Sequence, residues 1–125
     1  MKKFIYLWGP VILFAALIFT MSSMSFSMEK DPFPLFDKAA HVLEYSAFAI
    51  LLFRAFNGTL NGVNFFWVSL LTVTITLGYG ISDEFHQSFV PSRMSDIKDL
   101  VADGAGAMVA ITAMFIKRRL QGEGR

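Results

Sequence analysis

The chain has 125 residues, a net charge of +1 and no cysteine, and 54% of its residues are hydrophobic. Its mean hydropathy of +0.52 is too high for an ordinary soluble domain of this length. We therefore expect a membrane protein that forms one domain over residues 1–125. The near-neutral charge gives no support for nucleic-acid binding, and the lack of cysteine excludes disulfide bonds and thiolate chemistry.

In chain order, four apolar stretches predict transmembrane helices at about residues 4–26, 37–56, 64–84 and 97–117. Each stretch is close to the length of about 20 residues that a helix needs to cross a hydrocarbon core. The first follows two lysines, as the apolar part of a signal peptide would. Its long apolar region and poor cleavage site instead predict a retained helix. Pro32 and Pro34 prevent a helix in the next loop, and we expect Asp37 to cap the second span.

The loops and the flanking charges predict the topology. The turn at residues 57–62 is short enough to join antiparallel neighbours, which predicts an all-α bundle of four antiparallel transmembrane helices. The basic residues on the side of the termini are Lys2, Lys3, Arg54, Lys117, Arg118, Arg119 and Arg125. Those on the other side are Lys30, Lys38, Arg93 and Lys98. By the positive-inside rule, this bias predicts that both termini are cytoplasmic.

Small residues recur every four positions on the last two spans. They are Ala102, Gly106 and Ala110 on the fourth span, and Gly78 and Ser82 on the third. Small side chains at this spacing allow membrane helices to approach closely, because the hydrophobic effect does not drive association within lipid. We expect both stripes to be helix–helix contacts.

Nine of the ten acidic residues and both histidines lie in or beside the first and third loops, which face outward in this topology. Helical spacing groups the polar residues of three spans as Asp37, His41, Glu44 and Tyr45; Asp83, Glu84, His86 and Gln87; and Asp96, Asp99 and Asp103. Placing an ionised side chain at membrane depth costs at least about 2.5–3.5 kcal/mol. We therefore expect these residues to have ion-pair or hydrogen-bond partners, or a functional role. We predict one polar pocket at the outer end of the bundle.

Acids outnumber bases in this pocket, since seven acids face only Lys38, Arg93 and Lys98. Unless some acids are protonated, the imbalance implies an additional cation, a ligand or proton transfer. A divalent metal is one candidate, and the candidate ligands are His41, Glu44, Asp83 and His86. These residues form i, i+3 pairs on two helices, as in carboxylate–histidine bundle sites, although such pairs also occur by chance. The structural alternative is an ion-pair network that fixes the loops.

A third interpretation uses Arg93 and Lys38 to bind phosphate or carboxylate groups of lipid headgroups or lipid-linked envelope precursors. His41, His86 or a carboxyl group would then transfer a proton. The sequence contains no Gly-x-Ser-x-Gly motif or phosphate-binding glycine loop. Whether the protein is an enzyme therefore stays open.

Between residues 35 and 110, these residues form an ordered pattern: Asp37-Lys38-x-x-His41-x-x-x-Tyr45, then Glu84-x-x-Gln87-x-Phe89-x-Pro91-x-Arg93-x-x-Asp96-x-x-Asp99-x-x-x-Asp103-x-x-Gly106. This pattern resembles the VanZ-like membrane proteins of bacteria. The resemblance implies a small multi-pass helical protein of the bacterial cell membrane. The founding member is associated with resistance to the lipoglycopeptide teicoplanin. The chain departs from the family pattern at Asp103, often Asn in the family, and at Ser92, often Gly.

By family pattern, the functional candidates are Asp37, Lys38, His41, Glu84, Gln87, Arg93, Asp99 and Asp103. The leading hypothesis is that the pocket binds or processes an amphiphilic cell-envelope molecule, such as a membrane lipid, a lipid-linked precursor or a lipoglycopeptide. His41, Glu84 and Asp99 are the catalytic candidates in this hypothesis. Asp37, Lys38, Gln87, Arg93 and Asp103 are its binding candidates. The alternative is a non-enzymatic accessory protein, alone or as an oligomer, whose charged network is a scaffold or a partner-binding surface.

Overall fold

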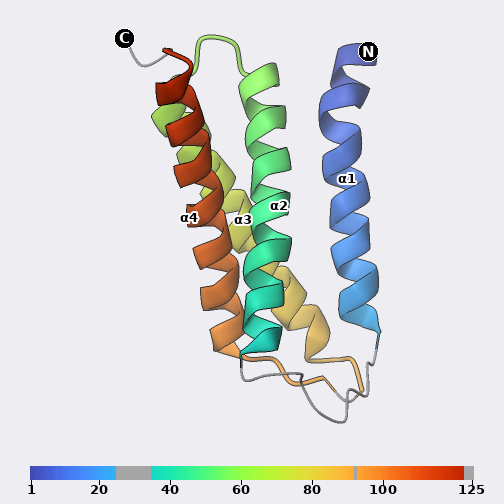
Figure 1. The fold of residues 1–125 in the computed structure, drawn as a ribbon. Coiled ribbons are helices and arrows are strands. Elements are labelled where there is room, and N and C mark those ends of the chain that lie inside the picture. The colour runs from blue at the N-terminus through green and yellow to red at the C-terminus, as the bar shows by residue number, and fades with distance from the viewer. Residues whose placement is uncertain (25–34, 92, 123–125) are drawn as a thin grey trace.

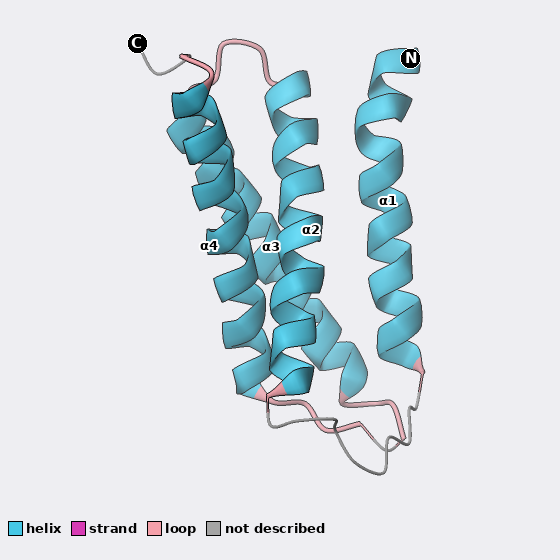
Figure 2. Ribbon diagram, in the orientation of Figure 1, coloured by secondary structure: helices cyan, strands magenta, loops and turns pink. Residues whose placement is uncertain are grey.

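The computed structural model describes residues 1–24, 35–91 and 93–122. It contains four helices, which are α1 (Lys2–Ser23), α2 (Phe36–Thr59), α3 (Phe65–Gln87) and α4 (Ile97–Leu120). Consecutive helices run in opposite directions, so α1 begins at the same end of the bundle as α4 ends (Figures 1 and 2). Each helix is long and apolar enough to cross a membrane. The predicted all-α class and four spans are therefore confirmed.

The helix boundaries lie within a few residues of the predicted ones, and the caps explain two of them. The Asn64 side chain accepts a hydrogen bond from the Trp67 amide at 3.2 Å and begins α3. Asp96 begins α4 in the same way. The predicted capping role of Asp37 is wrong, because α2 begins after Leu35 and Asp37 lies inside its first turn. The predicted breaks at Pro32 and Pro34, and residues Glu29, Lys30, Asp31 and Ser92, lie outside the described residues.

Helices α2 and α4 form the most extensive helix–helix contact of the bundle. A Cβ atom at Gly106 would lie 2.6 Å from the Val42 carbonyl oxygen, so only glycine allows the two backbones to approach this closely. The Ser46 hydroxyl lies 3.0 Å from the Gly106 carbonyl oxygen across the same contact. Ala107 and Ala110 continue it, and Ala102 is also buried. The predicted small-residue contact on α4 is confirmed.

The predicted contact on α3 is wrong. Gly78 and Ser82 are exposed, and a Cβ atom at Gly78 would meet nothing within 4 Å. The packed face of α3 instead carries Thr72, Thr76 and Gly80. Both faces contain small residues, so residue size did not distinguish the face that meets protein from the face that meets lipid.

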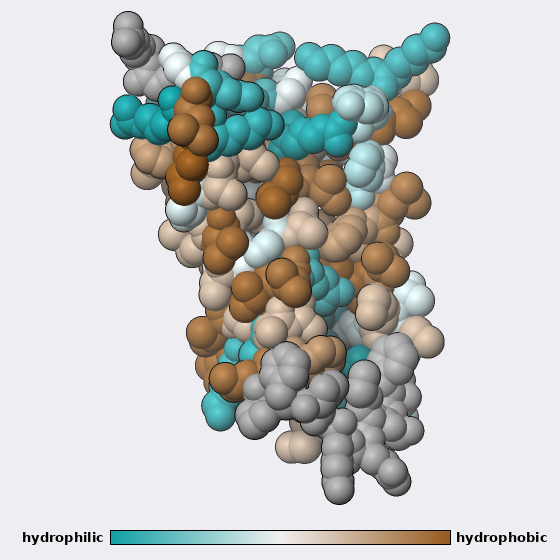
Figure 3. All heavy atoms as spheres, in the orientation of Figure 1, coloured by the Kyte–Doolittle hydropathy of each residue, from teal (hydrophilic) through white to brown (hydrophobic). Residues whose placement is uncertain are grey.

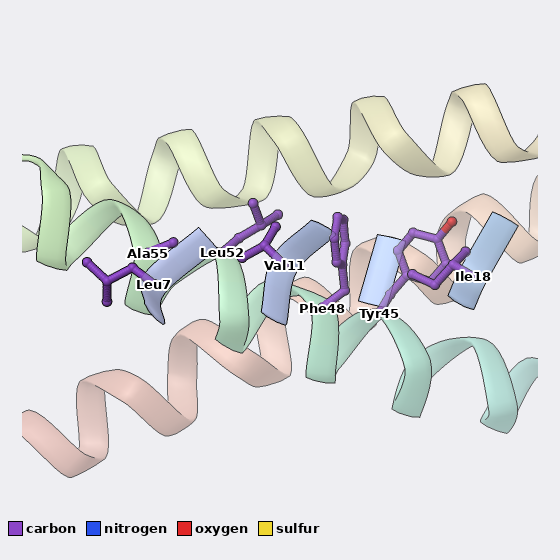
Figure 4. Packing of buried hydrophobic residues seen from close by; sticks show 7 residues of the cluster. All are labelled: Leu7, Val11, Ile18, Tyr45, Phe48, Leu52 and Ala55. Carbon is purple, nitrogen blue, oxygen red and sulfur yellow. The ribbon is translucent and has the colours of Figure 1, made fainter. Parts of the chain in front are cut away.

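Helix α1 packs at the edge of the bundle, mainly against α2 and also against α3. Its buried side chains interdigitate with those of α2 in one apolar cluster, seen in Figure 4, that comprises Leu7, Val11, Ile18, Tyr45, Phe48, Leu52 and Ala55. Two polar contacts add to this packing. Trp8 donates from its indole to the Thr59 hydroxyl at 3.0 Å, and the Tyr79 hydroxyl donates to the Ala15 carbonyl at 2.6 Å.

The hydropathy of the surface changes along the bundle axis. On the face seen in Figure 3, hydrophobic side chains cover the middle of the bundle, and hydrophilic ones gather at the end that carries the termini. Many large apolar residues are exposed, including Leu13 at 73% and Phe85 at 68%. This pattern fits helices whose outer faces contact lipid.

Candidate functional site

A cavity of about 330 Å³ lies at the end of the bundle where α1 and α3 end and α2 and α4 begin. Its polar lining comes from all four helices and the loop between α3 and α4, and consists of Ser22, Asp37, His41, Glu44, Asp83, Gln87, Arg93 and Asp99. Apolar side chains of α1, α2 and the same loop complete the wall. Most of the predicted pocket residues therefore come together, and Ile18, Met21 and Ser22 of α1 join them. Sequence analysis did not predict these three because nothing marks which face of α1 turns inward.

Lys38 is the central cation beside this cavity. Its ammonium group lies 3.0 Å from Asp37 and 3.4 Å from Asp96, and it makes a close ion pair with Asp99. The Asp99 side chain is 7% exposed, whereas that of Lys38 is 26% exposed. Three carboxylates therefore surround this ammonium group, which is not available as a free anion-binding group.

His41 continues the same network into the bundle. Its Nδ1 lies 2.8 Å from Oδ1 of Asp103, and its Nε2 lies 3.8 Å from Oδ2 of Asp99. When Asp103 is ionised, Nδ1 donates to it, which orients Nε2 toward Asp99. Asp103 is fully buried, and a Cβ atom at Gly80 would lie 2.8 Å from its second oxygen. Gly80 thus provides the space for Asp103, a role that the sequence did not predict.

Glu84 is the third catalytic candidate, but unlike His41 and Asp99 it does not line the cavity. One of its carboxylate oxygens accepts from the Ser95 hydroxyl at 3.0 Å and from the Asp96 amide at 2.9 Å. Its other oxygen is buried and contacts no donor in the described part of the chain. Glu84 is not among the cavity-lining residues. Its contacts connect α3 to the start of α4 and position the acidic residues that surround Lys38.

Asp96 has two roles at the start of α4. Its carboxylate accepts from the Lys98 amide at 2.9 Å and also contacts Lys38. The backbone hydrogen bond from Lys98 is the main reason that the pKa of Asp96 lies below its usual value, and Lys38 lowers this pKa further. The aspartate therefore stays ionised where it caps the helix.

Three further polar residues of the predicted pocket, Gln87, Asp83 and Tyr45, are buried. Gln87 donates to Asp83 at 3.1 Å across one turn of α3, and both side chains are buried. Tyr45 is fully buried, with its ring stacked on His41 at a centroid distance of 6.2 Å. The Tyr45 hydroxyl has no hydrogen-bond partner among the residues described. The Tyr45 ring therefore packs against the imidazole of His41 in the bundle interior.

Arg93 and His86 both contact α1. The Arg93 guanidinium donates to the carbonyl of Met21 at 3.2 Å and to that of Met24 at 3.3 Å. These carbonyls belong to the C-terminal end of α1, so Arg93 acts as its cap. Nε2 of His86 lies 2.8 Å from the Ser23 hydroxyl, and the imidazole stacks on Phe19. His86 is absent from the cavity lining, whereas Arg93 forms part of it.

The four metal candidates are not brought together as one ligand set. His86 contacts α1, while Glu44 and Asp83 line the cavity. A different group has ligand atoms within 4.8 Å of one another, namely Asp37, His41 and Asp99. Lys38 binds two of these carboxylates, so a metal ion there would compete with its ammonium group. The residue types suit a hard or borderline divalent cation, and the metal hypothesis stays a prediction.

The sequence model of the VanZ/LLP1 family matches residues 7–118, a range that includes most of all four helices. The chain belongs to the VanZ/LLP1 family. No curated protein and no solved structure matches it. The family resemblance of the polar pattern is thus confirmed, and the VanZ/LLP1 chain is a multi-pass membrane protein with four candidate spans.

In this VanZ/LLP1 protein, the cavity offers both charge and a proton-transfer group. Four carboxylates line it, whereas Arg93 is the one lysine or arginine in its described lining. His41 lies between two carboxylates, which is an arrangement suited to holding or moving a proton at Nε2. The geometry therefore favours a ligand that carries a cationic or hydrogen-bond-donating group.

Proposed function

We propose that the cavity binds an amphiphilic molecule of the bacterial cell envelope and exchanges a proton with it through His41. The observation that carries this proposal is the position of His41 in an acid-rich cavity that opens at one end of an apolar bundle. A headgroup in the cavity would meet Asp37, Glu44 and Asp83, while its acyl chains would lie along the exposed apolar faces. Candidate ligands are aminolipids, lipid-linked precursors and lipoglycopeptides of the teicoplanin type.

The proposal places the cavity on the outer side of the bacterial cell membrane and both termini in the cytoplasm. In the described part of the chain, Lys2, Lys3, Arg54, Lys117, Arg118 and Arg119 lie at the end that carries the termini. Lys38, Arg93 and Lys98 lie at the cavity end. Because the charge bias favours a cytoplasmic location for the termini, an outward cavity is accessible to envelope molecules and to antibiotics.

The two histidines provide a matched test. His41→Gln removes the proton-transfer group from the cavity, whereas His86→Gln changes the other histidine at the same end, outside the cavity lining. We expect His41→Gln to reduce teicoplanin resistance of an expressing strain to the level of an empty vector. His86→Gln should retain the wild-type minimum inhibitory concentration. Membrane abundance of both variants is measured to exclude a folding defect.

Binding and chemistry are separated by native mass spectrometry of the detergent-purified protein with teicoplanin and with phosphatidylethanolamine as probes. Retained binding with a lost phenotype in His41→Gln would support proton transfer. If neither probe binds the wild-type protein, and both variants keep the wild-type phenotype at normal abundance, the proposed function is wrong.

The ion-pair contacts favour a second candidate, which is an accessory protein without chemistry. Lys38 holds α2 to α4, and Arg93 holds the loop to α1, so the same residues form a rigid end surface. This candidate predicts that Lys38→Arg, which keeps the charge, restores the phenotype that Lys38→Met loses. It also predicts that His41→Gln retains that phenotype, in contrast to the leading proposal.

A further inference from the structure

A second and larger cavity lies at the opposite end of the bundle, mainly among α2, α3 and α4, with Leu7 of α1 also in its lining. Its volume is about 780 Å³, which is within the range of small-molecule and lipid-headgroup sites. Phe53, Phe65 and Met114 contribute apolar walls, and the basic residues of the lining are Arg54, Lys117 and Arg118. This cavity plays no part in the proposed function.

Among the residues that the structure describes, the charge at this end is unbalanced. Every acidic residue in the described ranges 35–91 and 93–122 lies at the other end of its helix or in the adjoining loop. The Arg54 guanidinium contacts the Tyr6 carbonyl at 3.4 Å and lies 4.3 Å from the centre of the Tyr6 ring. Neither contact supplies a negative charge. Asn64 and Phe65 place the N-terminal end of α3 on the cavity wall, but the C-terminal ends of α2 and α4 also lie there, so the positive potential comes from the basic side chains and not from the helix dipoles.

We propose that this cavity binds an anionic glycerophospholipid of the surrounding membrane, with its phosphate between Arg54 and Lys117. Phosphate accepts charge-assisted hydrogen bonds from arginine and lysine, and basic cavities between transmembrane helices are suited to such headgroups. The apolar wall provides a path for the lipid's glycerol and upper acyl chains toward the bilayer. Basic residues that only fix topology need to flank the spans, but they do not need to line a cavity.

The test uses full-length protein in mild detergent and counts bound lipid by native mass spectrometry. Phosphatidylglycerol is the probe, and phosphatidylcholine and inorganic phosphate are the comparison probes. Arg54→Gln/Lys117→Gln removes two of the three basic charges in the cavity lining. Lys2→Gln/Lys3→Gln removes two charges from the same end outside the cavity and is the matched control. We expect at least a tenfold weaker affinity for phosphatidylglycerol in the cavity variant and wild-type affinity in the control.

A third variant tests whether weaker lipid binding could result from misfolding of the charge variant. Val63→Trp keeps every charge but fills part of the cavity from an exposed turn, where a large side chain is tolerated. It should also weaken phosphatidylglycerol binding while the melting temperature stays near that of the wild type. Equal loss in the cavity and control pairs, or unchanged binding in Val63→Trp, would overturn the proposal. Retention of inorganic phosphate with no retained lipid would overturn the lipid assignment.

Discussion

Lys38 stabilises the cavity end of the bundle because its single positive charge contacts three carboxylates. We expect Lys38→Met to reduce the free energy of unfolding by about 1–3 kcal/mol, since it leaves the buried Asp99 carboxylate without its cation while part of the site stays solvated. The measurement is denaturant unfolding in mixed micelles. Lys38→Arg is the control and should recover most of the loss. Wild-type stability of Lys38→Met would show that the carboxylates do not depend on this ammonium group.

Asp96 gives a residue-scale prediction with a defined pH dependence. Its pKa is lower in the folded state, mainly because the Lys98 amide donates to it. Its contribution to stability is therefore complete above the usual aspartate pKa and is lost as the pH falls through the lowered value. The melting temperature of Asp96→Ala should lie below that of wild type at neutral pH, and the difference should shrink below about pH 4.

Asp96→Asn distinguishes the contribution of the capping hydrogen bond to stability from that of the negative charge. Asparagine keeps the cap acceptor but does not titrate, so its advantage over Asp96→Ala should not change across the same pH range. A pH dependence of equal size in Asp96→Asn would assign the effect to another group.

The contact between α2 and α4 yields a prediction at the scale of the element. Gly106→Ala places a methyl group 2.6 Å from the Val42 carbonyl oxygen, and we expect it to cost about 1–3 kcal/mol through overpacking. Gly78→Ala is the matched control, because its methyl group would meet open space on α3. This control should be neutral or stabilising by up to about 1 kcal/mol. Thermal unfolding of both variants checks the difference, and equal effects would contradict the close approach.

The sequence predicted the positions of the helices better than the contacts between them. Long apolar stretches determine where spans lie, because a bilayer admits few other backbone structures. Which face of a span meets protein depends on its partners, so the same small-residue spacing was informative at Gly106 and misleading at Gly78. Periodicity placed Asp37 and His41 on one face of the second span, and the predicted topology brought Asp99 of the fourth span to the same end. The contacts of Arg93 could not, because a loop side chain takes its direction from the docked α1.

At the scale of the whole molecule, the predicted orientation can be tested directly because the chain lacks cysteine. Met94→Cys lies at the cavity end, where Met94 is 86% exposed, and Lys3→Cys lies at the other end. A membrane-impermeant maleimide should label Met94→Cys in intact cells and Lys3→Cys only after permeabilisation. The reverse pattern would place the cavity in the cytoplasm. Labelling of both in intact cells would contradict a membrane-spanning bundle.

The cap that Arg93 places on α1 also sets an order of assembly. The guanidinium and the Met24 carbonyl that it contacts are 69 residues apart in the chain. At a synthesis rate of 5–20 residues per second, roughly 3 to 14 seconds separate the translation of these two groups. During that interval the first helix can pack against α2, which is made earlier, but its C-terminal end still lacks the cap that Arg93 provides. Completion of the cavity wall is therefore a late event in biogenesis.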